Sequence, residues 1–376
     1  MPSSRLALSL GIAFGAALVG AAVLGRKRRA AGAIRRKASE TTASATGAGA
    51  VLKLATTGTV CVDPDVGVHF WVSVKDAKAE AGRKASGAGA AAKGPRKPAF
   101  DPFEHPEDAL VVERDLTPTH YLQLNKFPVV DDHLLVVTKA WEAQTDVATV
   151  ADFGAIGAAL RAVDGFLFFN CGAASGASQP HKHFQLLPRD TLRASQAEAP
   201  LPYEIPMEGL ILGALPQADP SGDDARRLDA SIATVLPAPL GEALIVAARL
   251  PPGWWEEEGE EASAAAARGG GCAGCGCGGA ARVAALYERL LHHAGLPISR
   301  DGVDHCRDAA HPSHNMVCTR RWMVVAHRAC EPCAETGIGC NACGFGGFFL
   351  VRDAAQLAAL KSRGPARALV DLCARR

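Results

Sequence analysis

The chain has 376 residues, with 40 lysine and arginine residues against 39 aspartate and glutamate residues. Hydrophobic cores usually divide beyond roughly 250 residues, so the length suits two domains and a large buried core. The near-zero net charge excludes a global field of the kind that binds nucleic acid, so any polyanion must be held by local groups. The 12 cysteines are unevenly placed in this long chain, and we expect mostly reduced thiols rather than a disulfide scaffold.

The first 40 residues differ in composition from everything that follows. Residues 6–25 carry no charge, and a basic cluster follows directly at 26–29. Such a segment is long enough to span a bilayer, and the positive-inside rule would leave the rest of the chain facing the cytoplasm. A cleaved secretory signal, an organelle-targeting presequence and a disordered or amphipathic tail are the alternatives. We expect residues 1–40 to be an anchor or targeting segment and residues 41–58 to be a linker.

Between residues 59 and 205 the sequence predicts short strands and one helix. Hydrophobic residues recur at helical spacing over 145–163, where Thr145 or Asp146 can cap the helix. An Ala, Gly and Lys-rich stretch at 75–97 is typical of a loop insertion. Apolar, β-branched and aromatic runs predict strands. These runs occupy residues 66–74, 109–113, 121–125, 133–138, 165–171 and 181–187.

The sequence changes character after residue 205, where we place a domain boundary. A Gly, Cys and Glu-rich stretch at 251–280 predicts an exposed loop insertion. Strands and helices alternate without a regular βαβ pattern, which indicates an α+β fold with antiparallel sheets and packed helices. The later elements are predicted as a helix at 282–294, a strand within 315–327, a strand at 346–351 and helical structure at 353–375.

The segment His-Lys-His-Phe-Gln at 181–185 carries the strongest chemical pattern. Side chains of a strand alternate between its two faces, so His181, His183 and Gln185 share one face. Lys182 points the other way and needs a sheet edge or a phosphate. The preceding segment 172–179 is rich in glycine and serine, which lets backbone N–H groups approach an anion. We therefore expect a phosphate site just ahead of this strand.

A neutral imidazole at His183 can attack phosphorus and form a phosphoramidate that a second acceptor later displaces. The attack requires a fixed ring tautomer, and Gln185 can hydrogen-bond to the non-bridging oxygens of the transferred group. The leaving phosphates need a proton or a cation. His181, Lys126 and Lys182 are candidates for supplying it, and a divalent cation such as Mg²⁺ is the one cofactor that we consider.

Three sequence blocks resemble one known enzyme family. They are Asn-Lys-Phe-Pro-Val-Val at 125–130, Asn-Cys-Gly at 170–172, and Ser-Gly-Ala-Ser-Gln-Pro-His-Lys-His-Phe-Gln at 175–185 with Leu-Pro after it. They look like the diadenosine tetraphosphate phosphorylases, also called ATP adenylyltransferases, of the histidine-triad superfamily. The resemblance covers roughly residues 55–373. In its second half it depends on the blocks 315–325 and 337–347.

The resemblance implies a histidine-triad-like fold in two halves. These are an N-terminal catalytic region at 59–205 and a C-terminal adenylyltransferase region at 206–376. It implies phosphorolysis of diadenosine tetraphosphate to ATP and ADP, and the reverse adenylyl transfer, through AMP bound to a histidine. The implied ligands are nucleotides and phosphate, with no nucleic acid. Membrane association is expected separately, from the apolar segment 6–25.

The family's functional residues map onto individual positions of this chain. His183 matches the nucleophile, and Gln185 matches the glutamine that contacts phosphate. His181 is a third candidate on the same face, with the roles of acid, anchor or bystander left open. The remaining positions match groups that contact nucleotide and phosphates: Asn125, Lys126, Asn170, Gly176, Ser178 and Gln179.

Two kinds of alternative remain open from the sequence. A hexose-1-phosphate uridylyltransferase or a nucleotide-sugar phosphorylase would use the same histidine with another base and acceptor, and a nucleotide sensor would bind without turnover. The second alternative concerns metal. Cys330, Cys333, Cys340 and Cys343 form two Cys-x-x-Cys pairs with a spacing that suits tetrahedral zinc. Against zinc, the second pair falls inside the block 337–347, which otherwise matches the family.

Overall fold

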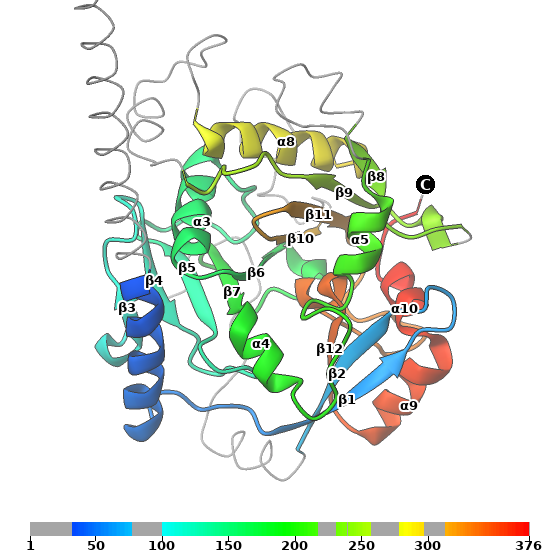
Figure 1. Cartoon of the computed structure of the whole chain (residues 1–376), viewed down its shortest axis with the longest axis horizontal. Coiled ribbons are helices and arrows are strands. Elements are labelled where there is room, and N and C mark those ends of the chain that lie inside the picture. The colour runs from blue at the N-terminus through cyan, green and yellow to red at the C-terminus, as the bar shows by residue number, and fades with distance from the viewer. Residues whose placement is uncertain are drawn as a thin grey trace, which may run out of the picture.

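The computed structural model describes residues 32–76, 100–216, 231–238, 240–256, 278–296 and 313–375. Two β-sheets with helices packed against them make up this part of the chain (Figure 1). The predicted membrane segment at 6–25 lies outside the described residues. Within those residues, no helix is both long enough and apolar enough to cross a membrane.

The larger sheet has nine strands in the order β3-β4-β5-β7-β6-β10-β11-β9-β8, and all its pairings are antiparallel. Strands from before and after residue 205 meet where β6 pairs with β10, so one sheet crosses the predicted boundary. In sheet order the strands are β3 Val111–Glu113, β4 His120–Leu124, β5 Leu134–Thr138, β7 His183–Pro188, β6 Gly165–Cys171, β10 His314–Cys318, β11 Trp322–His327, β9 Ile245–Arg249 and β8 Ile232–Thr234.

The smaller sheet joins the beginning of the described chain to its end. Its strands are β1 Thr56–Val62, β2 His69–Lys75 and β12 Phe348–Val351, in the order β1-β2-β12. β1 and β2 form an antiparallel pair, whereas β12 lies parallel to β2. In Figure 1 this sheet lies close to α9 (Ala354–Arg363) and α10 (Pro365–Asp371).

The two faces of the nine-stranded sheet pack against different partners. Helices α3 (Val150–Ala162) and α8 (Gly279–His293) contact each other and cover one face. The other face packs toward the smaller sheet and α5 (Glu208–Ala214), with α4 (Arg189–Ser195) following β7 in the chain. Alternation along β6 sends Phe169 into the first core and Phe168 into the second. A central strand is therefore apolar on both sides.

The predicted α+β class is confirmed, and the differences lie at the ends of elements. Helix α3 begins later than predicted, because Thr149 and Asp152 form a capping box there in place of a cap at Thr145 or Asp146. The region 315–327 forms two strands, since the chain turns back between β10 and β11. The linker prediction is wrong for residues 41–47, which are helical. Most of the predicted insertions at 75–97 and 251–280 lie outside the described residues.

Candidate functional site

His183 is the first residue of β7, where it is 3% exposed. Its Nδ1 atom lies 2.8 Å from the carbonyl oxygen of His181, and a carbonyl can only accept, so Nδ1 carries the ring proton. Burial lowers the pKa of His183 to about 4, although this hydrogen bond opposes the shift. The ring is therefore neutral at pH 7 and its Nε2 atom presents a lone pair.

His181 lies on the same strand face but has both ring nitrogens engaged. Nδ1 is 2.6 Å from Oδ2 of Asp101, and Nε2 is 2.9 Å from both the carbonyl oxygen and the hydroxyl of Thr138. Phe103 packs against this ring and, at 5.1 Å between ring centroids, against His183. The contacts of His181 are those of a fixed structural residue that holds the backbone beneath His183.

A cavity of about 550 Å³ lies along this face of the sheet. Five of the residues predicted to contact nucleotide or phosphate line it, and they come from the β4–β5 turn, β6, the glycine-rich loop and β7. His183 is not itself a lining residue; it lies two residues before Gln185 on the same strand and interacts electrostatically with the lining residue His133. The five lining residues are Asn125, Asn170, Gly176, Ser178 and Gln185.

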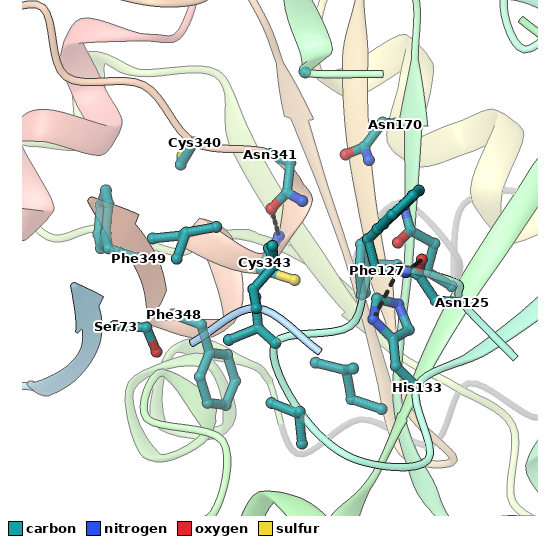
Figure 2. Close-up of a pocket in the computed structure, with 18 of the residues that line it drawn as sticks. Ser73, Asn125, Phe127, His133, Asn170, Cys340, Asn341, Cys343, Phe348 and Phe349 are labelled. Atoms are coloured by element: carbon teal, nitrogen blue, oxygen red, sulfur yellow. Dashed lines mark hydrogen bonds between the residues drawn. The ribbon is translucent and has the colours of Figure 1, made fainter. Parts of the chain in front are cut away.

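His133, just before β5, was not identified from the sequence. Asn125 accepts a hydrogen bond from the Phe127 backbone through Oδ1, so its Nδ2 group faces His133 and donates to Nδ1 at 3.2 Å (Figure 2). The Nε2 atom of His133 therefore carries the proton; among the described residues no acceptor meets this buried N–H in good geometry, and the Gln185 side chain interacts with it. Burial lowers the pKa of His133 to about 4. The cavity wall thus holds a neutral donor next to Gln185 that is available to a ligand.

An asparagine network connects this site to the C-terminal part of the chain. The Oδ1 atom of Asn170 accepts from Nδ2 of Asn315 at 2.9 Å and from the backbone N–H of Ala342 at 2.8 Å. Asn315 in turn accepts a hydrogen bond from the buried Arg328. Because Ala342 follows the lining residue Asn341, the network holds the C-terminal wall of the cavity against β6.

Gly176 explains how closely the glycine-rich loop approaches that wall. Its φ of +82° favours glycine, and a Cβ atom there would lie 3.1 Å from Cα of Asn341. Figure 2 shows Asn341 with its side chain bonded to the backbone of Cys343. The loop and the C-terminal wall are thus in direct contact at the edge of the cavity.

The far side of the cavity is apolar. Trp71, Phe348 and Phe349 line it from β2 and β12, with Leu54 and Val130 nearby. Figure 2 shows Phe348 and Phe349 on one side of the pocket and Asn125 and His133 on the other. The aromatic side also carries Ser73, but its rings, opposite the polar Asn125 and His133, suit a ligand with a charged part and a planar apolar part.

Two of the residues predicted to contact phosphate lie outside the cavity wall that the described residues form. Lys126 is 38% exposed and pairs with Glu107 at 2.5 Å. Gln179 is partly buried in the segment leading into β7. The structure therefore brings together Asn125, Asn170 and Gln185 along the cavity, whereas Lys126 and Gln179 are not among its lining residues.

Lys182 corrects the expectation of a sheet edge or a phosphate partner. Its side chain is fully buried on the α3 side of the sheet, 2.7 Å from Glu142 and 3.1 Å from Asp152. His120 also contacts Asp152, at 2.9 Å. Burial alone would lower the pKa of Lys182, but the two carboxylates outweigh it and raise the pKa above its ordinary value. The lysine is a buried ion-pair partner on the face opposite His183.

The zinc alternative has no support in the structure. Among the described residues, no group of three or more His, Cys, Asp or Glu side chains is placed to hold a metal ion. Burial raises the pKa of Cys340 to about 12 and that of Cys343 well above its ordinary value. Cys330 donates to the carbonyl oxygen of Asp371.

Comparison with known proteins identifies the family. Residues 25–208 match the family described as the Ap4A phosphorylase N-terminal domain, and residues 277–375 match the ATP adenylyltransferase C-terminal domain. The chain belongs to the Ap4A phosphorylase family. The two matches follow one another along the chain and together account for most of it.

Individual relatives of this Ap4A phosphorylase family member are from yeast. Diadenosine 5',5'''-P1,P4-tetraphosphate phosphorylase 2 of Saccharomyces cerevisiae is 38% identical over 102 residues, which are 24% of this chain and 31% of that protein. The aligned segment thus spans less than a third of the curated relative. The crystal structure of yeast Ap4A phosphorylase Apa2 in complex with Ap4A matches with a TM-score of 0.61 at 20% identity, covering 91% of this chain and 97% of that one. The same enzyme in complex with AMP matches with a TM-score of 0.60.

Proposed function

We propose that the chain phosphorolyses diadenosine tetraphosphate to ATP and ADP, and catalyses the reverse adenylyl transfer, through AMP bound covalently to His183. The observation that carries this proposal is the tautomer and the protonation of the His183 ring. Its Nδ1 proton is held by a carbonyl and its pKa is lowered to about 4, so Nε2 is a free nucleophile at pH 7. Membership of the Ap4A phosphorylase family supports the same reaction.

The reaction runs in two displacements. Nε2 of His183 attacks the phosphorus next to one adenosine, the new P–N bond forms, and the P–O bond to the rest of the chain breaks to release ATP. The imidazole gains positive charge as it attacks, and the carbonyl oxygen of His181 stabilises it by accepting from Nδ1. Phosphate then attacks the same phosphorus, the P–N bond breaks, and ADP leaves with the lone pair returned to Nε2. Two in-line displacements give net retention at phosphorus.

The polar end of the cavity supplies the donors for the phosphates. The side-chain amide of Gln185 and the N–H at Nε2 of His133 lie side by side there, and both are neutral groups buried from solvent. Hydrogen bonds from such preorganised donors gain strength where water is excluded. Ser178 and the backbone around Gly176 contact the phosphate chain from the glycine-rich loop.

His181 serves as a positioning residue rather than as the acid. Asp101 and Thr138 engage both of its ring nitrogens, which leaves neither for the leaving group. Its carbonyl oxygen fixes the tautomer of His183, so the ordering of His181 is transmitted directly to the nucleophile. The aromatic end of the cavity, with Trp71 and Phe348, receives the base.

The test follows the adenylyl group. The protein is incubated with adenine-labelled diadenosine tetraphosphate, with and without phosphate, and ATP, ADP and labelled protein are measured. Labelled protein should form without phosphate and discharge as ADP when phosphate is added, and His183→Ala should reduce both steps by about 10⁴-fold. Turnover by His183→Ala at the wild-type rate would overturn the histidine mechanism.

The same experiment separates the alternatives. Binding without label transfer in a single turnover would indicate a nucleotide sensor. Label transfer from a uridine-diphosphate sugar but not from diadenosine tetraphosphate would indicate a uridylyltransferase or a nucleotide-sugar phosphorylase. Either outcome would overturn the proposed substrate.

A further inference from the structure

We propose that Gln144 is a positioning residue whose side-chain amide is inserted between β6 and β7 and holds the backbone of His183 for attack. The proposal rests on the AMP-histidine reaction described above. Gln144 lies on the segment between β5 and α3 and is 3% exposed. Its role follows from three hydrogen bonds that take the place of strand pairing at the nucleophile.

The pairing of β6 with β7 stops just short of the nucleophile. The antiparallel register runs from Gly165 opposite Pro188 to Phe168 opposite Gln185. Continued by two residues, it would place Asn170 opposite His183. At that point Gln144 stands between the strands. The backbone N–H of His183 donates to Oε1 at 2.8 Å, and Nε2 donates to the carbonyl oxygens of Asn170 at 2.8 Å and His183 at 3.2 Å.

A glutamine side chain suits this position because it offers an acceptor and two donors on one planar group. Two of its partners are carbonyl oxygens, which only accept, so the NH₂ group must face them. Removing the amide would leave three backbone groups buried without partners, which is costly. One side chain therefore joins the nucleophile to Asn170, a residue of the cavity wall.

The backbone of Gln144 is itself hydrogen-bonded to the segment that leads into β7. The backbone N–H of Gln144 donates to the carbonyl oxygen of Pro180 at 2.8 Å, and the backbone N–H of Lys182 donates to the carbonyl oxygen of Glu142 at 2.8 Å. Residues 142–144 thus run antiparallel to 180–182, with Ala143 bridged to His181. The segment therefore holds His183 from one side while β5 pairs with it from the other.

The consequence for the reaction concerns geometry rather than affinity. Gln144 contacts backbone atoms of His183 and Asn170, and the ring of His183 is aimed by that backbone and by the carbonyl of His181. A nucleophile displaced by about 1 Å loses roughly 100-fold in rate. Substitution of Gln144 should therefore lower the rate of adenylyl transfer much more than the binding of the dinucleotide.

The experiment compares Gln144→Met, which keeps length and volume, with Gln196→Met as a control. Gln196 is also buried and donates to a backbone carbonyl, that of Glu204, at 3.0 Å. Formation of AMP-histidine in a single turnover and KM are measured on samples whose folding is verified by thermal unfolding. Gln144→Met should lower the rate about 100-fold with KM within about threefold of wild type. The control should keep the wild-type rate.

Gln144→Glu provides a second measurement, the pH dependence of the single-turnover rate, which would not change if Gln144 had a purely structural role. Its carboxylate cannot donate to the two carbonyls, and burial raises the pKa of such a group, so a lower pH restores one donor. The single-turnover rate of this variant relative to wild type should rise roughly tenfold from pH 8 to pH 6, whereas that of Gln144→Met should stay flat.

Two failures can be told apart. If the wild-type protein forms no AMP-histidine, the proposed function fails and this proposal fails with it. If the wild type forms it and folded Gln144→Met does so at the same rate, the positioning role alone is overturned. A rate for Gln144→Glu that does not recover relative to wild type on acidification also overturns it.

Discussion

Polar groups are buried on both faces of the sheet at the start of strand β7, but in opposite ways. On one face Lys182 is fully buried, and its charge is matched by Asp152 and Glu142. On the other face His183 and His133 are also buried, but they stay neutral, and the N–H of His133 lies beside Gln185 at the cavity wall. A paired charge holds the strand in place, whereas neutral donors at a cavity wall can turn to a ligand.

This contrast assigns stability to one face and reactivity to the other. Residues on the Lys182 face and residues on the His183 face should therefore respond differently to substitution. Changes on the Lys182 face should lower the free energy of unfolding, and changes on the His183 face should lower the rate. Each prediction below tests one side of that separation.

The largest effect on stability is expected for Lys182→Met. It leaves Asp152 buried without its main counter-charge, which should cost about 3–5 kcal/mol of unfolding free energy. Urea denaturation measures the loss, and the double variant Lys182→Met with Asp152→Asn should recover part of it. A loss of activity with unchanged stability would show that Lys182 acts on the phosphates after all.

His133→Phe should have the opposite signature. It removes the buried Nε2–H beside Gln185 and the acceptor of Asn125 Nδ2, so the free energy of unfolding should fall by only about 1 kcal/mol, while kcat/KM should fall by about 100-fold because one phosphate donor is lost. Steady-state kinetics and thermal unfolding measured on the same sample check both parts. Wild-type kinetics in this variant would remove His133 from the phosphate site.

Acidification should separate stability from reactivity in the wild-type protein. The pKa of His183 and that of His133 are lowered to about 4, so the folded protein binds fewer protons than the unfolded chain between pH 4 and 6.5. Stability is therefore lost as pH falls through this range, by about 2 kcal/mol for each histidine at pH 5. The single-turnover rate of the folded protein should stay flat to pH 5 and fall only near pH 4. A rate that halves near pH 6.5 would contradict a depressed pKa at His183.

The smallest effect is expected for Lys126→Ala. In the wild-type protein Lys126 forms an exposed ion pair with Glu107, and such pairs contribute about 0–1 kcal/mol to the free energy of unfolding. KM should change by at most about fivefold. Lys139→Ala, which removes a comparable exposed pair with Asp115, is the matched control. A rise in KM that is specific to Lys126 and far above this range would mean that the lysine reaches the phosphates.

Local rules were enough to predict much of β7 and its surroundings. Period-two alternation placed His181, His183 and Gln185 on one face, and a phosphate site was predicted in the glycine-rich loop, where Gly176 lines the cavity. The same rule carried a signal for His133, which is in phase along the strand that pairs with β7. The signal was missed because the residue begins an otherwise apolar run.

Other features depended on partners far away in the sequence. Helix α3 begins after Thr149 because Asp152 completes a capping box, and Asp152 is in turn held by His120 and Lys182. The asparagine network needs β6 and β10 side by side, although about 145 residues separate Asn170 from Asn315. No periodicity in a single segment specifies such a pairing.

The sequence by itself determined which residues share a strand face and that the fold is α+β, and it supplied the prediction that His183 is the nucleophile. Those properties depend on the geometry of one strand and on side-chain chemistry. Only the tertiary structure decided that Lys182 is an ion-pair partner, that His181 is an anchor and that Gln144 stands between β6 and β7. Protonation, burial and hydrogen-bond partners depend on neighbours supplied by other strands, and those neighbours are fixed when the nine-stranded sheet forms.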